Sequence, residues 1–156
     1  MKSYHLALLG FGNVGRALAG LLKTKTAELR DRYGIGWKIT GVASRRIGWL
    51  ANPDGFDVDA LLANNYQSPI TAVSIQEWLS ASRADALFEN SSLNPLTGQP
   101  AIDHVKAGLE HGAHVVTAMA VEMLKASASN PAASAPTAEA RQAGWATSET
   151  AASKVG

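Results

Sequence analysis

Apolar and polar positions change period repeatedly along the chain, so that strand-like and helix-like segments follow one another. An apolar run over residues 5–9 is typical of a buried parallel strand. It leads into residues 14–33, where leucines recur at helical spacing and charged residues occupy most other positions. Because this change of period recurs further on, we expect a parallel α/β sheet with right-handed crossovers.

The later elements are shorter. The loop signals Pro53 and Asp54-Gly55 predict a loop over residues 47–55, and Asp57 is expected to cap the helix that follows it. Further strands are expected over residues 37–43, 84–89 and 114–117, and further helices over residues 58–65, 75–81 and 100–110.

Residues 125–156 differ in composition from the rest of the chain. Ala, Ser and Thr dominate, two prolines interrupt the segment, and apolar periodicity is almost absent. Such a segment buries too little apolar surface to offset the loss of chain entropy on folding. We therefore expect one domain over residues 1–124 and a disordered tail over residues 125–156.

Composition excludes several classes of function. The 14 basic and 13 acidic residues nearly balance, so no global field favours nucleic acid or an anionic membrane as a partner. Cysteine is absent, which removes disulfides, thiolate metal sites and hydride transfer through a thiohemiacetal. The start of the chain does not resemble a signal peptide and no apolar run reaches spanning length, so a cytoplasmic protein is expected.

Residues 4–15, YHLALLGFGNVG, join a strand signature directly to a glycine pattern and a helix. In a G-x-G-x-x-G loop, Gly10 would allow the tight turn, Gly12 would let the backbone approach a pyrophosphate, and Gly15 would let the helix pack on the sheet. The helix N-terminus would then attract the phosphates. The alternative is a βα turn whose glycines serve packing only.

The polar turn Ser44, Arg45 and Arg46 follows the second expected strand, where such folds meet the adenosine ribose. An NAD-specific site usually offers Asp or Glu there, whereas arginine suits the 2′-phosphate of NADP. We therefore expect NADP as the preferred cofactor over NAD, with Arg45 the first contact and Ser44 a hydrogen-bond donor. The alternative is that both arginines are solvated surface charges.

With these segments and the run ENSSLNPLTGQPAIDHVKAGLEHGAHVVTA, the chain resembles the N-terminal nucleotide-binding domain of the homoserine dehydrogenase family. The likeness covers about residues 6–118. It implies a Rossmann-type doubly wound parallel sheet. It also implies an NAD(P)-dependent oxidoreductase that interconverts L-homoserine and L-aspartate 4-semialdehyde, in the biosynthesis of threonine, methionine and isoleucine.

The resemblance also implies a set of cofactor-binding residues at the carboxyl ends of the strands. The nicotinamide ribose would lie beside Ser91 and Ser92, and the nicotinamide beside Thr117 and Ala118. The pyrophosphate loop would consist of Gly10, Phe11, Gly12, Asn13, Val14 and Gly15.

After Ala118 the sequence departs from the family, because Met119 and Ala120 stand where its members have an Asn-Lys pair and then a substrate lobe. We therefore expect a truncated, catalytically incomplete chain with no catalytic residue of its own. The alternative is a stand-alone NADP(H)-binding or regulatory module. Either a homo-oligomer or a partner that supplies the later lobe is compatible with this expectation.

No metal site is expected. Asp54, Asp57 and Asp59 lack the spacing of a calcium loop, and the histidines at 104, 111 and 114 have no recognisable ligand spacing. Glu89 ends an expected strand, and its position alone fits a catalytic or a structural carboxylate equally well.

Overall fold

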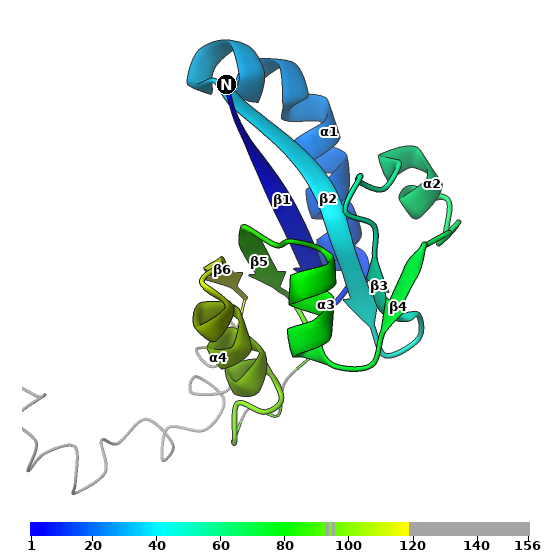
Figure 1. Ribbon diagram of the computed structural model, residues 1–156, viewed down its shortest axis with the longest axis vertical. Helices are drawn as coiled ribbons and strands as arrows, with labels where there is room; N and C mark the ends of the chain where they lie inside the picture. Colours follow the sequence, from blue (N-terminus) through cyan, green and yellow to red (C-terminus); the bar gives the residue numbers. More distant parts are fainter. Residues whose placement is uncertain (93, 95, 119–156) are drawn as a thin grey trace, which may run out of the picture. The chain divides into compact units, whose positions relative to one another are not determined.

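A six-stranded sheet forms the centre of the computed structural model, which describes residues 1–92, 94 and 96–118 (Figure 1). The strand order is β4-β3-β2-β1-β5-β6. The strands are β1 Lys2–Leu9, β2 Ile35–Ser44, β3 Gly48–Ala51, β4 Ile70–Ala72, β5 Ala86–Glu89 and β6 His114–Thr117. The helices are α1 Asn13–Tyr33, α2 Val58–Leu62, α3 Ile75–Ala81 and α4 Ala101–His111.

The neighbouring strands β2, β1, β5 and β6 are parallel to one another. Strand β3 pairs antiparallel with β2, and β4 pairs antiparallel with β3. The expected α/β fold with a mostly parallel sheet is confirmed, and the antiparallel pairing of β3 and β4 at this edge was not expected. Residues 47–55 are not only a loop, because β3 turns straight back beside β2 and pairs Ser44 with Gly48. The mixed edge follows from this short connection, since parallel neighbours need a long crossover.

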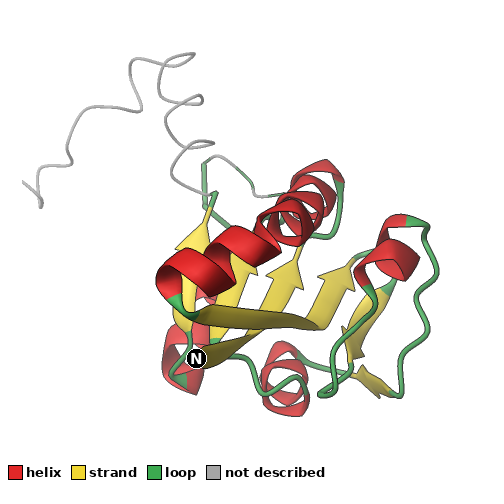
Figure 2. Ribbon diagram, turned by 90° about the horizontal axis from the view of Figure 1, so that it is seen from above, coloured by secondary structure: helices red, strands yellow, loops and turns green. Residues whose placement is uncertain are grey.

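Helices cover both faces of the sheet (Figure 2). On one face, Ala19 of α1 and Leu61 of α2 pack with Leu8, Val42 and other apolar side chains of the strands. On the other face, α3 and α4 pack on alternate strand positions, with the fully buried Trp78 in the core. Strand residues that alternate between two apolar layers explain why the segment 6–9 has no polar position.

The ends of the helices agree closely with the sequence. Asp57 caps α2 by accepting a hydrogen bond from the backbone N–H of Ala60, at 2.7 Å. Gly34 and Gly112 end α1 and α4 in the left-handed conformation. Helix α2 ends at Leu62 rather than at residue 65, and α3 and β6 have the expected bounds. The expected boundary at residue 124 and the disorder of residues 125–156 concern residues outside those described, so they stay predictions.

Candidate functional site

A pocket of about 730 Å³ lies at the carboxyl ends of β1, β2 and β5. In an open α/β sheet this is where ligands collect, because the strand ends and the following loops form a crevice. Most of the residues singled out by the sequence line this pocket. They are Gly10, Phe11, Gly12, Asn13, Val14, Ser44, Arg45, Arg46, Ser91 and Ser92.

The three glycines of the loop after β1 occupy different surroundings. Gly10 has φ +89°, and a Cβ there would lie 2.5 Å from the backbone C and O of Asn90. A Cβ on Gly15 would lie 2.8 Å from the carbonyl oxygen of Gly10. A Cβ on Gly12 would have no atom of another described segment within 4 Å. Gly10 and Gly15 are therefore required by the turn and by packing, whereas Gly12 borders open space.

Gly12 is also the N-cap of α1, and no side chain caps this end of the helix. The first turn of α1 has no acidic residue. The first backbone N–H groups of a helix have no partner within the helix and lie at the positive end of its dipole. Among the residues that the structure describes, no Asp or Glu lines the pocket. This wall is therefore suited to an anion.

The loop after β2 contributes cations to the same pocket. Arg45 and Arg46 are exposed, and neither guanidinium has a hydrogen bond or an ion pair within the part of the chain that the structure describes. Oγ of Ser44 accepts a hydrogen bond from the backbone N–H of Ile47, at 3.3 Å. The expected role of Ser44 as a donor to the cofactor is compatible with this bond, because the hydroxyl hydrogen is not used in it.

The opposite wall is built around the buried carboxylate of Glu89. Its Oε1 accepts hydrogen bonds from the backbone N–H of Ser91, at 3.1 Å, and from the hydroxyl of Ser91. Its Oε2 accepts from Oγ1 of Thr117, at 3.2 Å. Nδ1 of His104 lies 3.4 Å from Oε1 and 3.2 Å from Oγ of Ser91.

Burial and hydrogen bonding act on this carboxylate in opposite directions. Burial alone would raise the pKa of Glu89, but the hydrogen bonds from His104, from Ser91 and from Thr117 outweigh it and hold the pKa below its ordinary value. Glu89 is therefore ionised at neutral pH, and its negative charge strengthens the hydrogen bonds that its carboxylate accepts.

Three predicted residues do not line the pocket. Gly15 is buried beneath the loop, and Thr117 lies beside Glu89 at the end of β6. The backbone N–H of Ala118 donates to the carbonyl oxygen of Glu89, at 3.0 Å. Thr117 and Ala118 are thus both tied to the end of β5.

Seven other residues that line the pocket were not indicated by the sequence, which are Leu9, Ala43, Gly48, Trp49, Asn90, Pro100 and His104. The ring of Trp49 stands edge-on to that of His104, with centroids 6.2 Å apart. Nδ2 of Asn90 is buried and has no hydrogen-bond partner among the described residues. The one available signal was the position of Asn90 directly after a strand end.

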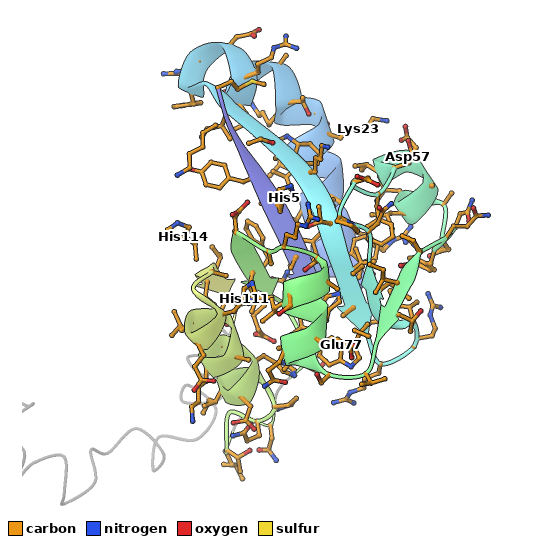
Figure 3. The ribbon with its side chains drawn as sticks, in the orientation of Figure 1. His5, Lys23, Asp57, Glu77, His111 and His114 are labelled. Carbon is orange, nitrogen blue, oxygen red and sulfur yellow. The ribbon has the colours of Figure 1, made fainter. Side chains whose placement is uncertain are left out.

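The described residues include no group of three or more His, Asp or Glu side chains placed to hold a metal ion. His111 and His114, labelled in Figure 3, belong to the end of α4 and to β6, while His104 is engaged with Ser91 and Glu89. Among the same residues, no helix has the length and apolar character needed to cross a membrane.

Known proteins give a consistent comparison. No protein-family model matches the chain. An NAD(+)-dependent homoserine dehydrogenase of Pseudomonas canavaninivorans is 32% identical over 126 residues, a match that covers 75% of this chain and 36% of that protein. The chain is related to the homoserine dehydrogenases.

Solved structures agree with this relationship. A hyperthermophilic archaeal homoserine dehydrogenase mutant in complex with NADPH is 25% identical, with a TM-score of 0.57, over 74% of this chain and 35% of that one. A protein from Archaeoglobus fulgidus assigned as a homoserine dehydrogenase is 27% identical, with a TM-score of 0.55, over 73% of this chain and 33% of that one. The chain spans about a third of the length of these homoserine dehydrogenases, which is consistent with an N-terminal domain.

Proposed function

We propose that this chain binds a nicotinamide dinucleotide, as the cofactor-binding part of an oxidoreductase of the homoserine dehydrogenase type. The observation that carries the proposal is the open space in front of Gly12, at the uncapped N-terminus of α1, in a pocket whose described lining residues include no carboxylate. A pyrophosphate is the part of a dinucleotide that such a wall suits, because backbone N–H groups and the helix dipole favour its charge.

The rest of the pocket divides in the order of a dinucleotide. Gly10, Phe11, Gly12, Asn13 and Val14 would hold the pyrophosphate, and Gly15 would support them by packing. The adenosine ribose would lie beside the loop after β2, and the nicotinamide half beside the loops after β5 and β6. The site residues of that half are Ser91, Ser92, Thr117 and Ala118, with the last two acting through their attachment to Glu89.

We propose NADP as the preferred cofactor. Arg45 and Arg46 border the pocket without partners among the described residues, and Ser44 stands where NAD-specific folds carry an acidic residue. A free guanidinium gains charge-assisted hydrogen bonds from a 2′-phosphate and nothing comparable from a ribose hydroxyl. The Pseudomonas relative is NAD(+)-dependent, so this preference is a specific claim about the loop after β2.

The nicotinamide, when bound, supplies the hydride acceptor or donor, and the residues of this chain bind and orient it. We assign no catalytic residue. In the reaction of the family, the interconversion of L-homoserine and L-aspartate 4-semialdehyde, a further lobe supplied by a partner would bind the substrate and carry the acid-base group. We further propose that the protein works in the cytoplasm.

A second candidate function is a stand-alone module that binds NADP(H) without chemistry. The replacement of the family's Asn-Lys pair by Met119 and Ala120 favours it. Purified protein supplied with homoserine and either oxidised cofactor tests both candidates together, because neither an incomplete cofactor-binding part nor a module without chemistry should reduce the cofactor. Homoserine-dependent reduction would refute both the module and the catalytic incompleteness of the chain.

The cofactor preference is tested by titrating the protein with NADPH and NADH and recording their fluorescence. We expect NADPH to bind more tightly, by about 10-fold or more, since a hydrogen bond to a charged group contributes about 1.5–3 kcal/mol. The double variant Arg45→Ala, Arg46→Ala should bind both cofactors alike, with the affinity for NADH unchanged. Equal affinities in the unmodified protein would contradict the NADP preference and leave dinucleotide binding intact.

A further inference from the structure

The carboxylate of Glu89 joins three segments that are distant in the sequence. Only 1% of the residue is exposed, yet its two oxygens receive bonds from the loop after β5, through Ser91, and from the end of β6, through Thr117. His104 of α4 reaches the same Oε1 atom and the hydroxyl of Ser91. One buried charge thus organises the ends of two strands and a helix.

Glu89 itself is not part of the pocket wall, whereas two of its partners are. Ser91 and His104 line the pocket, and the ring of His104 stands edge-on to that of Trp49, which lines the same pocket. The backbone supports the same arrangement, because the N–H of Asn90 donates to the carbonyl oxygen of Leu9 at 2.7 Å. A change at Glu89 would therefore move groups that face a ligand without removing any of them.

An ionised carboxylate is specifically required for this geometry. A carboxylate only accepts hydrogen bonds, so it holds both the N–H and the hydroxyl of Ser91 as donors directed towards it. A neutral amide in its place would present an NH₂ group to one side and would weaken the remaining bonds, since bonds to charged groups are about twice as strong.

We propose that Glu89 is a positioning residue for the nicotinamide half of the cofactor. Its carboxylate fixes Ser91 and His104 on the pocket wall and leaves the wall around the glycine loop untouched. The identity of the ligand rests on the proposed function above. The two hydrogen bonds by which Glu89 holds Ser91, called the clamp below, do not depend on it.

The chain offers a matched control at the opposite end of the same strand. Asp85 directly precedes β5, and its carboxylate accepts a hydrogen bond from the backbone N–H of His5, at 2.7 Å, and lies 3.1 Å from Nδ1 of His5. Neither residue lines the pocket. Asp85→Asn therefore neutralises a bonded carboxylate beside β5 without touching the ligand wall.

The test compares Glu89→Gln with Asp85→Asn, using NADPH and ADP as two probes. ADP carries the adenosine and the pyrophosphate and lacks the nicotinamide riboside. We expect Glu89→Gln to lower the affinity for NADPH about 10-fold, because the loss of a hydrogen bond to a charged group leaves Ser91 and His104 less well positioned. The affinity for ADP should stay unchanged. Asp85→Asn should change neither affinity. Equal losses for NADPH and ADP, or no loss, would overturn the proposal.

Hydrogen exchange at the Ser91 amide supplies a reading without cofactor. Its N–H donates to Glu89, so exchange should be faster in Glu89→Gln and unchanged in Asp85→Asn. Faster exchange in a protein that binds no dinucleotide would uphold the clamp and refute the proposed function. Dinucleotide binding with the same affinity in both forms would do the reverse. If Glu89→Gln fails to fold, Glu89→Asp, which keeps the charge but withdraws it by one methylene, is expected to give the same pattern.

Discussion

The substitution Gly12→Ala separates ligand binding from folding. A Cβ at Gly12 would have no atom of another described segment within 4 Å, and φ there is −102°, outside the left-handed region that favours glycine. The free energy of unfolding should therefore change by no more than about 1 kcal/mol, the sum of a slightly poorer N-cap and a less flexible unfolded chain. The same empty space is where the pyrophosphate is proposed to approach the backbone.

The expected loss of affinity follows from that geometry. A methyl group in front of the helix N-terminus would hold the phosphates away from the N–H groups of Asn13 and Val14. Losing one bond to a charged group costs about 1.5–3 kcal/mol, which corresponds to a roughly 10- to 100-fold weaker complex. NADPH fluorescence titration measures the affinity, and urea denaturation measures the stability of the same samples.

Gly20 provides the matched control, because it lies inside α1 and a Cβ there would also have no atom within 4 Å. Gly20→Ala should stabilise the protein by about 0.5–1 kcal/mol, as expected for alanine in a helix interior, and leave NADPH binding unchanged. The reasoning is refuted if Gly12→Ala binds NADPH as tightly as the unmodified protein, or if it unfolds so easily that its loss of binding only reports unfolding.

Three further outcomes are expected. Gly10→Ala should lose at least about 2 kcal/mol of stability in urea denaturation, because its Cβ would lie 2.5 Å from the backbone of Asn90 at a φ of +89°; a smaller change would contradict the tight turn. Trp78→Phe should lower the free energy of unfolding by about 2–4 kcal/mol, since Nε1 of this fully buried ring donates to the carbonyl oxygen of Leu50 at 2.8 Å. Its affinity for the ligand should be unchanged, and a lower affinity in a fully folded variant would contradict a purely structural role for Trp78. The lowered pKa of Glu89 means that its ionised form stabilises the fold. This contribution is complete above the pKa of the unfolded state and is lost as the pH falls through the pKa of the folded state. In urea denaturation from neutral to acid pH, the free energy of unfolding should therefore fall more steeply in the unmodified protein than in Glu89→Gln.

The sequence predicts most elements of this fold because their signals are local. Asp57 caps α2 and Gly112 ends α4 through atoms a few residues away, so spacing along the chain is sufficient to find them. The hairpin of β2 and β3 was not predicted, because β3 has only four residues and is formed through its pairing with neighbouring strands. The one local signal was the glycine at position 48, which begins β3 with a φ of +74°, a conformation that glycine adopts most readily.

The site divides in the same way. The glycine loop and the turn at Ser44 are contiguous motifs and could be located from the sequence alone. His104 and Trp49 reach the pocket from α4 and from the unpredicted strand β3, so their positions depend on how these elements pack on the sheet. The role of Glu89 also required the structure, because its partners lie 2, 15 and 28 residues away in the chain.

The most direct test of dinucleotide binding at this pocket is a titration of ¹⁵N-labelled protein with NADPH, followed by amide chemical shifts. Binding at the proposed site should shift the amides of residues 10–15 and 44–46 most, with smaller changes at Ser91 and little change at the remote end of β1. Saturating NADPH that leaves the amides of residues 10–15 unshifted would contradict the account.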